Sequence, residues 1–209
     1  MDAGTQRIAA TLGVVLGICL VASAGPVRIY GGDFALPIPA STSSSKGWMN
    51  DAIIQIPDHF IVADLDVSID ITHSKVFDLQ IFVQSPTGGR LCLNSYNISE
   101  YFDGENYTQT IFDDEAQSPI EQGGPPFTGR FRPESGGLLS IFDGQDTFGD
   151  WRLQINDMYF ADSGMLDNVQ LIVTIPEPAT AILFSVAAGL ALPFRSRRNR
   201  LFSNCTKSI

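Results

Sequence analysis

Acidic side chains gathered in two short stretches are the residues of this chain whose type and spacing most directly suggest chemistry. Asp113 and Asp114 stand together in "FDDEA", and Asp143 and Asp146 in "FDGQD". Carboxylate oxygens presented by loops are the ligands that calcium prefers, so these four residues form a candidate calcium site. The spacing in "DGQDTFGD" is not that of an EF-hand loop, however, and an acidic exported domain also carries such carboxylates for solvation. We expect no other cofactor.

The two histidines are the candidates for acid–base catalysis, and neither stands in a setting typical of a serine protease. Such an enzyme needs a nucleophile, a base and an orienting carboxylate in one constellation. His59 follows "IPD" and His73 follows the strand-like stretch "VSIDIT", whereas subtilases place a Gly-rich segment at the histidine and "GTSMA" at the serine. The HExxH, CxxC and P-loop motifs do not occur either. We therefore predict no catalytic residue and no enzyme activity of the chain itself.

The distribution of charge argues against nucleic acid as a partner. The 209 residues allow one ordinary domain with short extensions. Residues 25–175 contain 7 Lys and Arg against 21 Asp and Glu, a net charge of −14, whereas the residues outside this span contain 6 basic against 2 acidic side chains. Phosphate binding needs clustered Lys and Arg, and the acidic middle of the chain does not provide them.

The N-terminus has the form of an export signal. Arg7 precedes the apolar run "IAATLGVVLGICLV", which is too short for a comfortable membrane span. The small residues "ASA" follow, with Ala22 and Ala24 at the positions that signal peptidase prefers. We predict a signal peptide over residues 1–24, cleavage after Ala24 and a secreted product.

The C-terminal segment has the form of a marginal membrane anchor. Residues 179–194 carry no charge and would extend roughly 24 Å as a helix, against about 30 Å for the hydrocarbon core of a bilayer. Arg195, Arg197 and Arg198 follow directly, and such a cluster marks the cytoplasmic side of a transmembrane helix. The residues alone thus predict a short C-terminal transmembrane segment.

Between these ends the hydrophobic pattern is that of strands. In "ADLDVSIDIT" (residues 63–72) apolar and polar side chains alternate, which is typical of a half-buried strand. Further candidates are "FDLQIFVQ", "RLCLN", "YTQTIF", "WRLQIND" and "NVQLIVTI". Short strands separated by turns predict an all-β antiparallel sandwich or barrel. We place this domain at residues 47–175 and treat residues 25–46, which include "PIPASTSSSKG", as a linker.

The order of the motifs in this region resembles a known family. The stretch "VSIDITHSKVFDLQIFVQSPTGGRLCL" is followed by "FDDEA", by "PFTGRFRPE" and by "FDGQDTFGDWRLQINDMYFADSGMLDNVQLIV". This succession resembles the P domain, also called Homo B, which follows the catalytic domain of kexin- and furin-like subtilases and occurs in many bacterial secreted proteins. The resemblance implies a jelly-roll β-sandwich similar to galactose-binding domains. In subtilases the P domain stabilises the neighbouring catalytic domain and supplies no catalytic residue, and the resemblance implies the same kind of role here.

The residues that match the family pattern are expected to have structural roles. They are His73, Asp78, Gly149, Trp151, Asp157, Asp162 and Gly164. We expect Trp151 to fill the core, Gly149 and Gly164 to satisfy turn geometry, and the two later aspartates to accept backbone N–H bonds in the last loop. His73, at the end of a strand, is expected to hydrogen-bond a loop.

The C-terminal segment also resembles a known sorting signal. "IPEPATAILFSVAAGLALPFRSRRNR" has the Pro-Glu-Pro, apolar stretch and arginine cluster of the PEP-CTERM signal of Gram-negative bacteria that secrete exopolysaccharide. The resemblance implies that an exosortase recognises Pro176, Glu177 and Pro178, acts on residues 176–200 and sends the protein to the envelope or matrix. Residues 201–209 extend beyond the usual end of such signals.

Two functions therefore stand beside each other. The first is an exported, non-catalytic module, membrane-anchored at least transiently, that binds or stabilises a protein or glycan partner such as an exopolysaccharide. The second is an accessory P domain that stabilises a subtilisin/kexin-like serine endopeptidase made from another gene, and so takes part in proteolysis. Hydrolysis by the chain itself is a third, less favoured alternative.

Overall fold

The computed structural model describes residues 25–95, 104–134 and 136–177. The predicted signal peptide with Ala22 and Ala24, the apolar helix at residues 179–194 and the sorting residues from Pro178 onward lie outside these ranges. Within them, no helix has the length and apolar character needed to cross a membrane.

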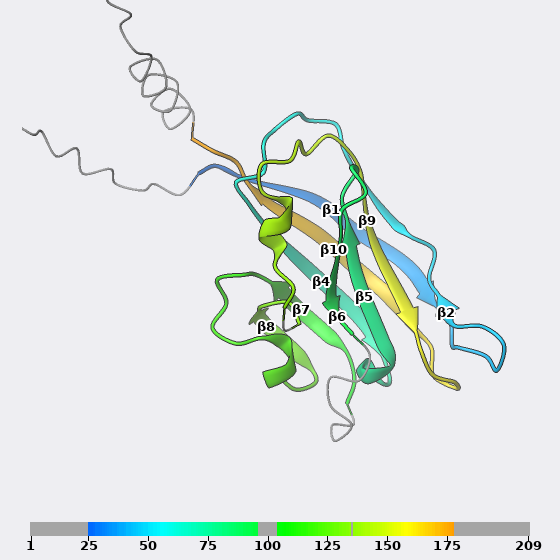
Figure 1. Cartoon of the computed structure of the whole chain (residues 1–209). Coiled ribbons are helices and arrows are strands. Elements are labelled where there is room, and N and C mark those ends of the chain that lie inside the picture. Colours follow the sequence, from blue (N-terminus) through cyan, green and yellow to red (C-terminus); the bar gives the residue numbers. More distant parts are fainter. Residues whose placement is uncertain (1–24, 96–103, 135, 178–209) are drawn as a thin grey trace, which may run out of the picture.

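The described residues form ten strands in two facing sheets (Figure 1). The first sheet has the order β1 (Val27–Ile38), β10 (Gly164–Thr174), β4 (Asp64–His73), β7 (Tyr107–Phe112) and β8 (Phe127–Phe131). The second has the order β2 (Gly47–Trp48), β9 (Gly149–Asp157), β5 (Leu79–Gln84) and β6 (Arg90–Asn94), with β3 (Ala52–Ile56) also paired to β9. Three short 3-10 helices are η1 (Val76–Asp78), η2 (Ile120–Gln122) and η3 (Leu139–Phe142). The predicted all-β sandwich is confirmed.

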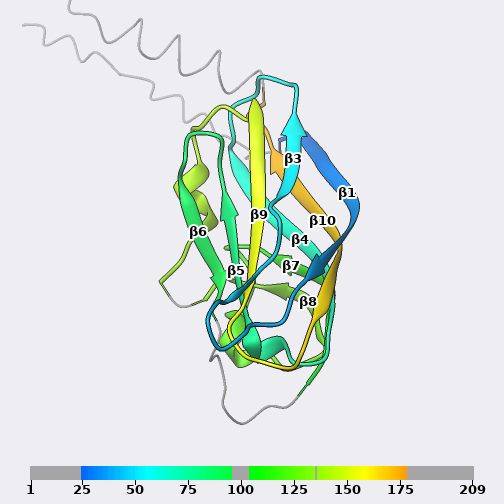
Figure 2. The same cartoon turned by 90° about the vertical axis from the view of Figure 1, so that its right-hand side faces the viewer.

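Alternation of apolar residues builds the core between the sheets (Figure 2). In β4, Leu65, Val67 and Ile69 point inward and are almost fully buried. In β9, Trp151 and Leu153 do the same from the opposite sheet. Each such side chain contributes about 1.5–3 kcal/mol on burial, so the sandwich is held by apolar packing across the two layers.

The first strand lies inside the segment predicted to be a linker. β1 runs antiparallel to β10, from Val27 opposite Thr174 to Ile38 opposite Gly164. Its alternation is broken by "GGD" and by a bulge between Asp33 and Leu36, so the period of two is not visible in the sequence. The linker assignment of residues 25–46 is therefore wrong for residues 27–38.

One strand pair departs from the predicted antiparallel pattern. β8 lies parallel to β7, with Tyr107 opposite Phe127 and Phe112 opposite Phe131. The rings of Tyr107 and Phe127 stack with their centroids 5.0 Å apart. "FTGRF" was not predicted as a strand, because five residues interrupted by a glycine carry little periodicity.

The chain enters and leaves the sandwich at one end. The backbone N–H of Ile175 donates to the carbonyl of Pro26 at 3.0 Å, beside the start of β1 and the end of β10 (Figure 1). We call this the terminal end. The loops at residues 57–63 and 143–148 also lie here, since the N–H of Gly144 donates to the carbonyl of Val62 and that of Ala63 to Thr174. The loops at residues 39–46 and 158–163 lie at the opposite end.

Candidate functional site

An open groove of about 760 Å³ crosses three adjacent strands of the second sheet. Gln55 of β3 is paired with Asp150 of β9, and Gln84 of β5 with Arg152 of β9. Directly paired residues of an antiparallel ladder point to the same face, and this is the face opposite the buried Trp151. The register therefore places two amides, one carboxylate and one guanidinium side by side on the outer face of the sheet.

Most of the hydrogen-bonding capacity of this groove is unused. Among the described residues, the side chains of Gln55, Gln84 and Asp150 make no hydrogen bond or ion pair. Arg152 donates from Nη1 to Oδ2 of Asp51 at 3.1 Å. Because the four residues stand on paired strands, the backbone ladder fixes the points from which their side chains extend. The groove can therefore donate to and accept from a ligand without rearrangement of the sheet.

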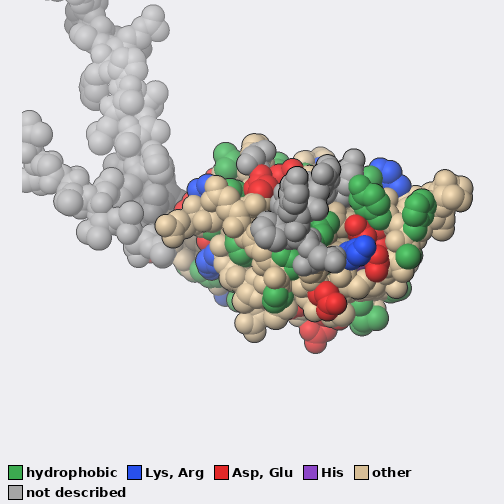
Figure 3. Space-filling view, turned by 90° about the horizontal axis from the view of Figure 1, so that it is seen from below, with side chains coloured by type: hydrophobic (Ala, Val, Ile, Leu, Met, Phe, Trp, Pro, Cys, Tyr) green, Lys and Arg blue, Asp and Glu red, His purple; other side chains and the backbone are tan. Residues whose placement is uncertain are grey.

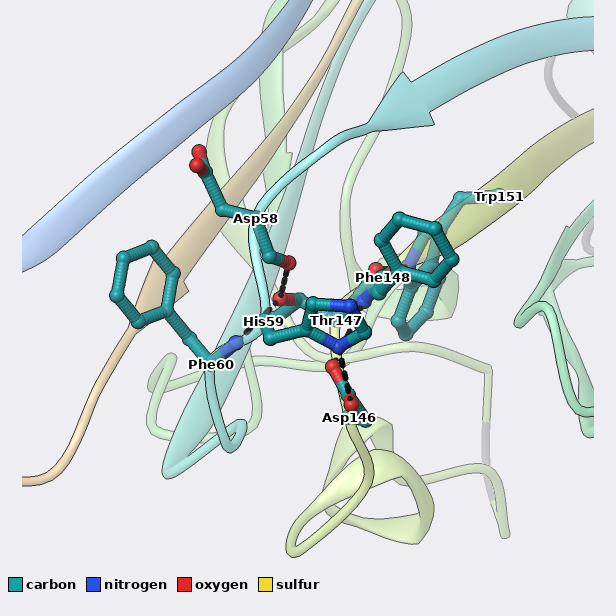
Figure 4. Close-up of polar contacts among 7 residues, drawn as sticks. All are labelled: Asp58, His59, Phe60, Asp146, Thr147, Phe148 and Trp151. Atoms are coloured by element: carbon teal, nitrogen blue, oxygen red, sulfur yellow. Dashed lines mark hydrogen bonds and ion pairs between the residues drawn. The ribbon is translucent and has the colours of Figure 1, made fainter.

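Several hydrogen bonds join two loops that border the groove, and the side chain of Thr147 makes two of them, as Figure 4 shows. The hydroxyl of Thr147 donates to the carbonyl of Asp58 at 2.7 Å and accepts from the N–H of Phe60 at 3.0 Å. The carbonyl of Thr147 accepts from the indole N–H of Trp151 at 2.9 Å. Thr147 is fully buried, so it fixes the loop at residues 57–61 against the loop at residues 146–148 and both against the core.

Phe148, at the rim of the groove, is held by a histidine and an aspartate. Its ring stacks on the imidazole of His59, with centroids 4.2 Å apart and planes inclined by 12°. One oxygen of Asp146 lies 2.8 Å from Nδ1 of His59, and the other accepts from the N–H of Phe148 at 3.0 Å. These two hydrogen bonds hold the pKa of Asp146 below its ordinary value, the bond to His59 contributing most. The aromatic side chain is thereby positioned while half of it stays exposed.

Gly149 forms part of the groove wall beside Phe148. Its φ is +120°, and a Cβ there would lie 2.9 Å from Cβ of Pro86. Both the backbone conformation and the close approach require glycine. Gly149 thus begins β9 instead of standing in a turn, and its lack of a side chain keeps the groove open.

The family-motif residues His73, Asp78 and Asp157 form a buried polar cluster at the opposite end of the sandwich. Nδ1 of His73 accepts from the N–H of Lys75 at 3.0 Å, and Nε2 lies 3.4 Å from Oδ2 of Asp157. The other Asp157 oxygen accepts from the N–H of Tyr159 at 2.9 Å. Burial, followed by the nearby Asp157 carboxylate, raises the pKa of Asp78. The cluster joins the end of β4 to the loop after β9.

Of the remaining family-motif residues, Trp151 lies where it was expected, whereas Asp162 and Gly164 do not. Trp151 is buried in β9 and meets Phe142 edge to face at 5.2 Å. Asp162 accepts from the hydroxyl of Ser74 at 2.7 Å instead of from a backbone N–H. Gly164 begins β10 instead of a turn, and a Cβ on it would lie 2.4 Å from Cδ2 of His73, so close packing is what requires glycine there.

Three of the four candidate calcium ligands, Asp113, Asp114 and Asp146, are bound by protein groups. Arg130 binds Asp113, and the two oxygens of Asp114 accept from the backbone N–H groups of Leu139 and Ser140 at 2.8 and 2.9 Å. Asp146 accepts from or pairs with His59. Burial raises the pKa of Asp143, and the negative charges of Asp64 and Asp114 raise it further. The part of the chain that the structure describes contains no group of three His, Cys, Asp or Glu side chains that could hold a metal ion.

Neither the groove nor the contact between His59 and Asp146 is visible in the amino-acid sequence. Alternation alone places Gln84 and Arg152 on the solvent side of their strands, but it does not say which strands are neighbours. His59 and Asp146 are 87 positions apart in the chain, so no local pattern indicates their contact. A local signal is present only at "DTFGD", where a large aromatic residue precedes a glycine at the start of a strand.

Comparisons with known proteins give a family and several similar structures. The model of the proprotein convertase P-domain matches residues 62–173. No curated protein matches the chain. The serine protease of Aeromonas sobria is 18% identical over 72% of this chain and 26% of that chain, with a TM-score of 0.41. In its complex with a chaperone the same protease is 17% identical over 73% and 26%, with a TM-score of 0.41. This chain thus spans about a quarter of the length of the protease.

Proposed function

This chain belongs to the proprotein convertase P-domain family, and from that premise we propose that it is a non-catalytic binding module. The observation that carries the proposal is the groove across β3, β9 and β5, in which polar side chains on rigid strands have unused hydrogen-bonding capacity. A site of this kind, concave with a few placed polar groups and an aromatic rim, is suited to recognition of a ligand.

The positions of the histidines support a binding role over hydrolysis. His59 precedes β4 and His73 ends it, so a strand of ten residues separates them. Among the described residues, neither imidazole hydrogen-bonds a serine, threonine or cysteine side chain: His59 contacts Asp146, and His73 contacts the Lys75 backbone and Asp157. The contact of His59 and Asp146 resembles a base with its orienting carboxylate, but here it supports Phe148.

We propose further that the terminal segments carry the module to the cell surface. Residues 1–24 would direct export and be removed, and residues 176–200, with Pro176 and Glu177 directly after β10, would be recognised by an exosortase and anchor the chain at least transiently. The domain is acidic, and on the face seen in Figure 3 apolar, acidic and basic side chains are mixed without an extended basic patch; both facts support an envelope or matrix partner in place of nucleic acid.

A second candidate function is that of an accessory domain for a separate subtilase. The observation that favours it is a set of exposed aromatic side chains at the end opposite the termini, namely Trp48, Tyr159 and Phe160. The N–H of Ser41 donates to the carbonyl of Tyr159 at 3.0 Å, so these residues belong to loops that are tied together. Exposed aromatic residues are typical of protein–protein contacts, and a protease domain would be the natural partner for this family.

The two functions are separated by site-specific photo-crosslinking in the native cell. A photoreactive residue at Gln55 probes the groove, and one at Phe160 probes the far end. We expect adducts with envelope or matrix components from position 55. Adducts with a subtilase from position 160 would instead establish the accessory role.

The same cells test export and sorting. We expect the protein in the envelope or matrix fraction, and loss of that location when residues 176–209 are removed. If the protein were found only in the cytoplasm, with no adduct from either position, both proposed functions would be wrong.

A further inference from the structure

We propose that the groove binds an uncharged glycan segment, with Phe148 as the surface on which a sugar ring stacks. The inference rests on the proposed function as a binding module and gives the chemical class of its ligand. Four polar side chains of the sheet would hydrogen-bond the sugar hydroxyls, and the contact of His59 with Asp146 would keep the aromatic ring in place.

The charge of the groove is what favours an uncharged ligand. Its lining contains one carboxylate, Asp150, and one guanidinium, Arg152, two residues apart on β9. The other polar side chains that line it are uncharged, whereas residues 25–175 have a net charge of −14. A polyanion would be repelled by the domain as a whole. A polycation would be drawn to its many other carboxylates, away from a groove of balanced charge.

The side-chain chemistry fits vicinal hydroxyl groups. Each amide of Gln55 and Gln84 offers both a donor and an acceptor, Asp150 accepts through two oxygens, and Arg152 donates. Neighbouring hydroxyls of a sugar have the same mixed character. The aliphatic C–H face of a sugar ring then needs an apolar surface, and Phe148, with half of its side chain exposed at the rim, supplies one.

The geometry of the sheet disfavours the two common peptide ligands. An extended peptide binds by adding a strand to a free sheet edge, but the floor of the groove is β9, whose backbone is paired with β3 on one side and β5 on the other. An amphipathic helix needs an apolar groove, and the strands of this one present two amides, a carboxylate and a guanidinium to the ligand. A ligand recognised by side chains alone, as a glycan is, fits both facts.

The position of the groove in the molecule agrees with a surface polysaccharide as its source. The groove lies where β3 ends and β9 begins, which is the end of the sandwich where β1 starts and β10 finishes (Figures 1 and 2). The C-terminal segment leaves from that end. If this segment is held at the envelope, the groove lies next to the surface layer instead of pointing away from it.

His59 and Asp146 are positioning residues in this site. They touch Phe148 by stacking and through its backbone N–H, and among the described residues neither lines the groove itself. Loss of either should leave the polar side chains of the sheet in place and free the aromatic ring. Their replacement should therefore weaken binding less than removal of the ring.

The test uses the full chain in a zwitterionic detergent on an array of neutral glycans (glucans, mannans, galactans and xylans) and of charged ones (alginate and chitosan oligosaccharides). Affinities for the bound glycans are then measured by titration calorimetry. We expect binding to at least one class of neutral glycan, about tenfold weaker in Phe148→Ala and in Gln84→Ala, since a tenfold change corresponds to about 1.4 kcal/mol. Leu138→Ala, which removes an equally exposed apolar side chain outside the groove, should bind as the unaltered protein does.

The positioning role has its own readout. His59→Ala should weaken binding about threefold, and His59→Phe, which retains a ring to stack on Phe148, should restore it; a merely structural role for the histidine would not give this rescue. Binding only to charged glycans, binding to none, or equal affinities of the unaltered protein and Phe148→Ala would overturn the inference. If the array fails while position 55 still captures a surface protein, the binding module stands and only the glycan ligand is wrong.

Discussion

Asp146 is the residue whose ionisation reports most directly on the site. Its two oxygens bind His59 and the N–H of Phe148, and the pKa of its carboxyl is held below the ordinary 3.8, chiefly by His59. A lowered folded-state pKa means that the contact stabilises the folded protein above pH 3.8 and that this contribution is lost as the pH falls through the lowered value. We expect a carboxyl ¹³C titration to give a pKa for Asp146 under 3.8.

The matched variant for this prediction is His59→Ala. It removes the largest cause of the shift, so the pKa of Asp146 should rise toward its ordinary value while the bond from Phe148 keeps part of the effect. Equal pKa values in the two proteins would mean that the contact does not form in solution.

Thr147 is the buried residue whose side chain contributes two hydrogen bonds between the loops beneath the site. Thr147→Val keeps the shape of the side chain but removes the bond to the carbonyl of Asp58 and leaves the N–H of Phe60 without its partner. An unsatisfied buried donor costs about 1–3 kcal/mol. We expect a loss of that size in the free energy of unfolding, measured by urea denaturation.

The control for this variant is Thr128→Val, at an exposed threonine whose single hydrogen bond is 3.4 Å long. Its effect should stay within about 0.5 kcal/mol, as is usual for surface positions. Similar losses for both threonines would show that Thr147 does not carry the connection between the loops.

At the scale of elements, the contact between β4 and β10 depends on a glycine. Gly164 lies opposite His73, and a Cβ on it would approach both the imidazole Cδ2 and the carbonyl oxygen of Thr72 to 2.4 Å. Because one neighbour is backbone, the strands must move apart. We expect Gly164→Ala to lower the free energy of unfolding by about 1–3 kcal/mol, as followed by thermal or urea denaturation.

Gly124→Ala is the comparison, because no heavy atom lies within 4 Å of the Cβ that it would add. That substitution should be neutral or slightly stabilising, since it restricts only the unfolded chain. If Gly124→Ala destabilised the protein as much as Gly164→Ala does, close packing would not be the reason that position 164 requires glycine.

At the scale of the whole molecule, β1 decides where the domain begins. It buries Ile38 completely and packs Tyr30, Phe34 and Leu36 against the core, and it covers the edge of β10. A fragment of residues 25–177 should unfold cooperatively, whereas residues 47–177, the domain expected from sequence, should be unfolded or aggregated. The loss includes about 1.5–3 kcal/mol for Ile38 alone, against a total of about 5–15 kcal/mol for a typical domain.

Circular dichroism and gel filtration of the two fragments decide this prediction. The longer one should be monomeric with a sharp thermal transition, and the shorter one should expose an unpaired strand edge, which favours aggregation. If the two fragments unfolded at the same midpoint, β1 would not contribute to the stability of the domain.

The sequence by itself determined the fold class and the inward faces of the regular strands. A period of two is a local property, and the burial of Val67 and Leu153 follows from it as soon as two faces exist. The same period misses β1, where two glycines and a bulge interrupt the alternation, and β8, which is too short to show it. The family resemblance also came from the sequence, because its motifs are contiguous.

Only the tertiary structure decided where the site lies. The groove brings together Gln55, Gln84 and Arg152 because β3 and β5 flank β9. The sequence of a single strand does not determine which strands will be its neighbours. His59 and Asp146 meet across 87 residues, because two loops are joined at Thr147. Local patterns depend on neighbours in the chain, whereas a binding surface depends on which distant segments the shared core brings together.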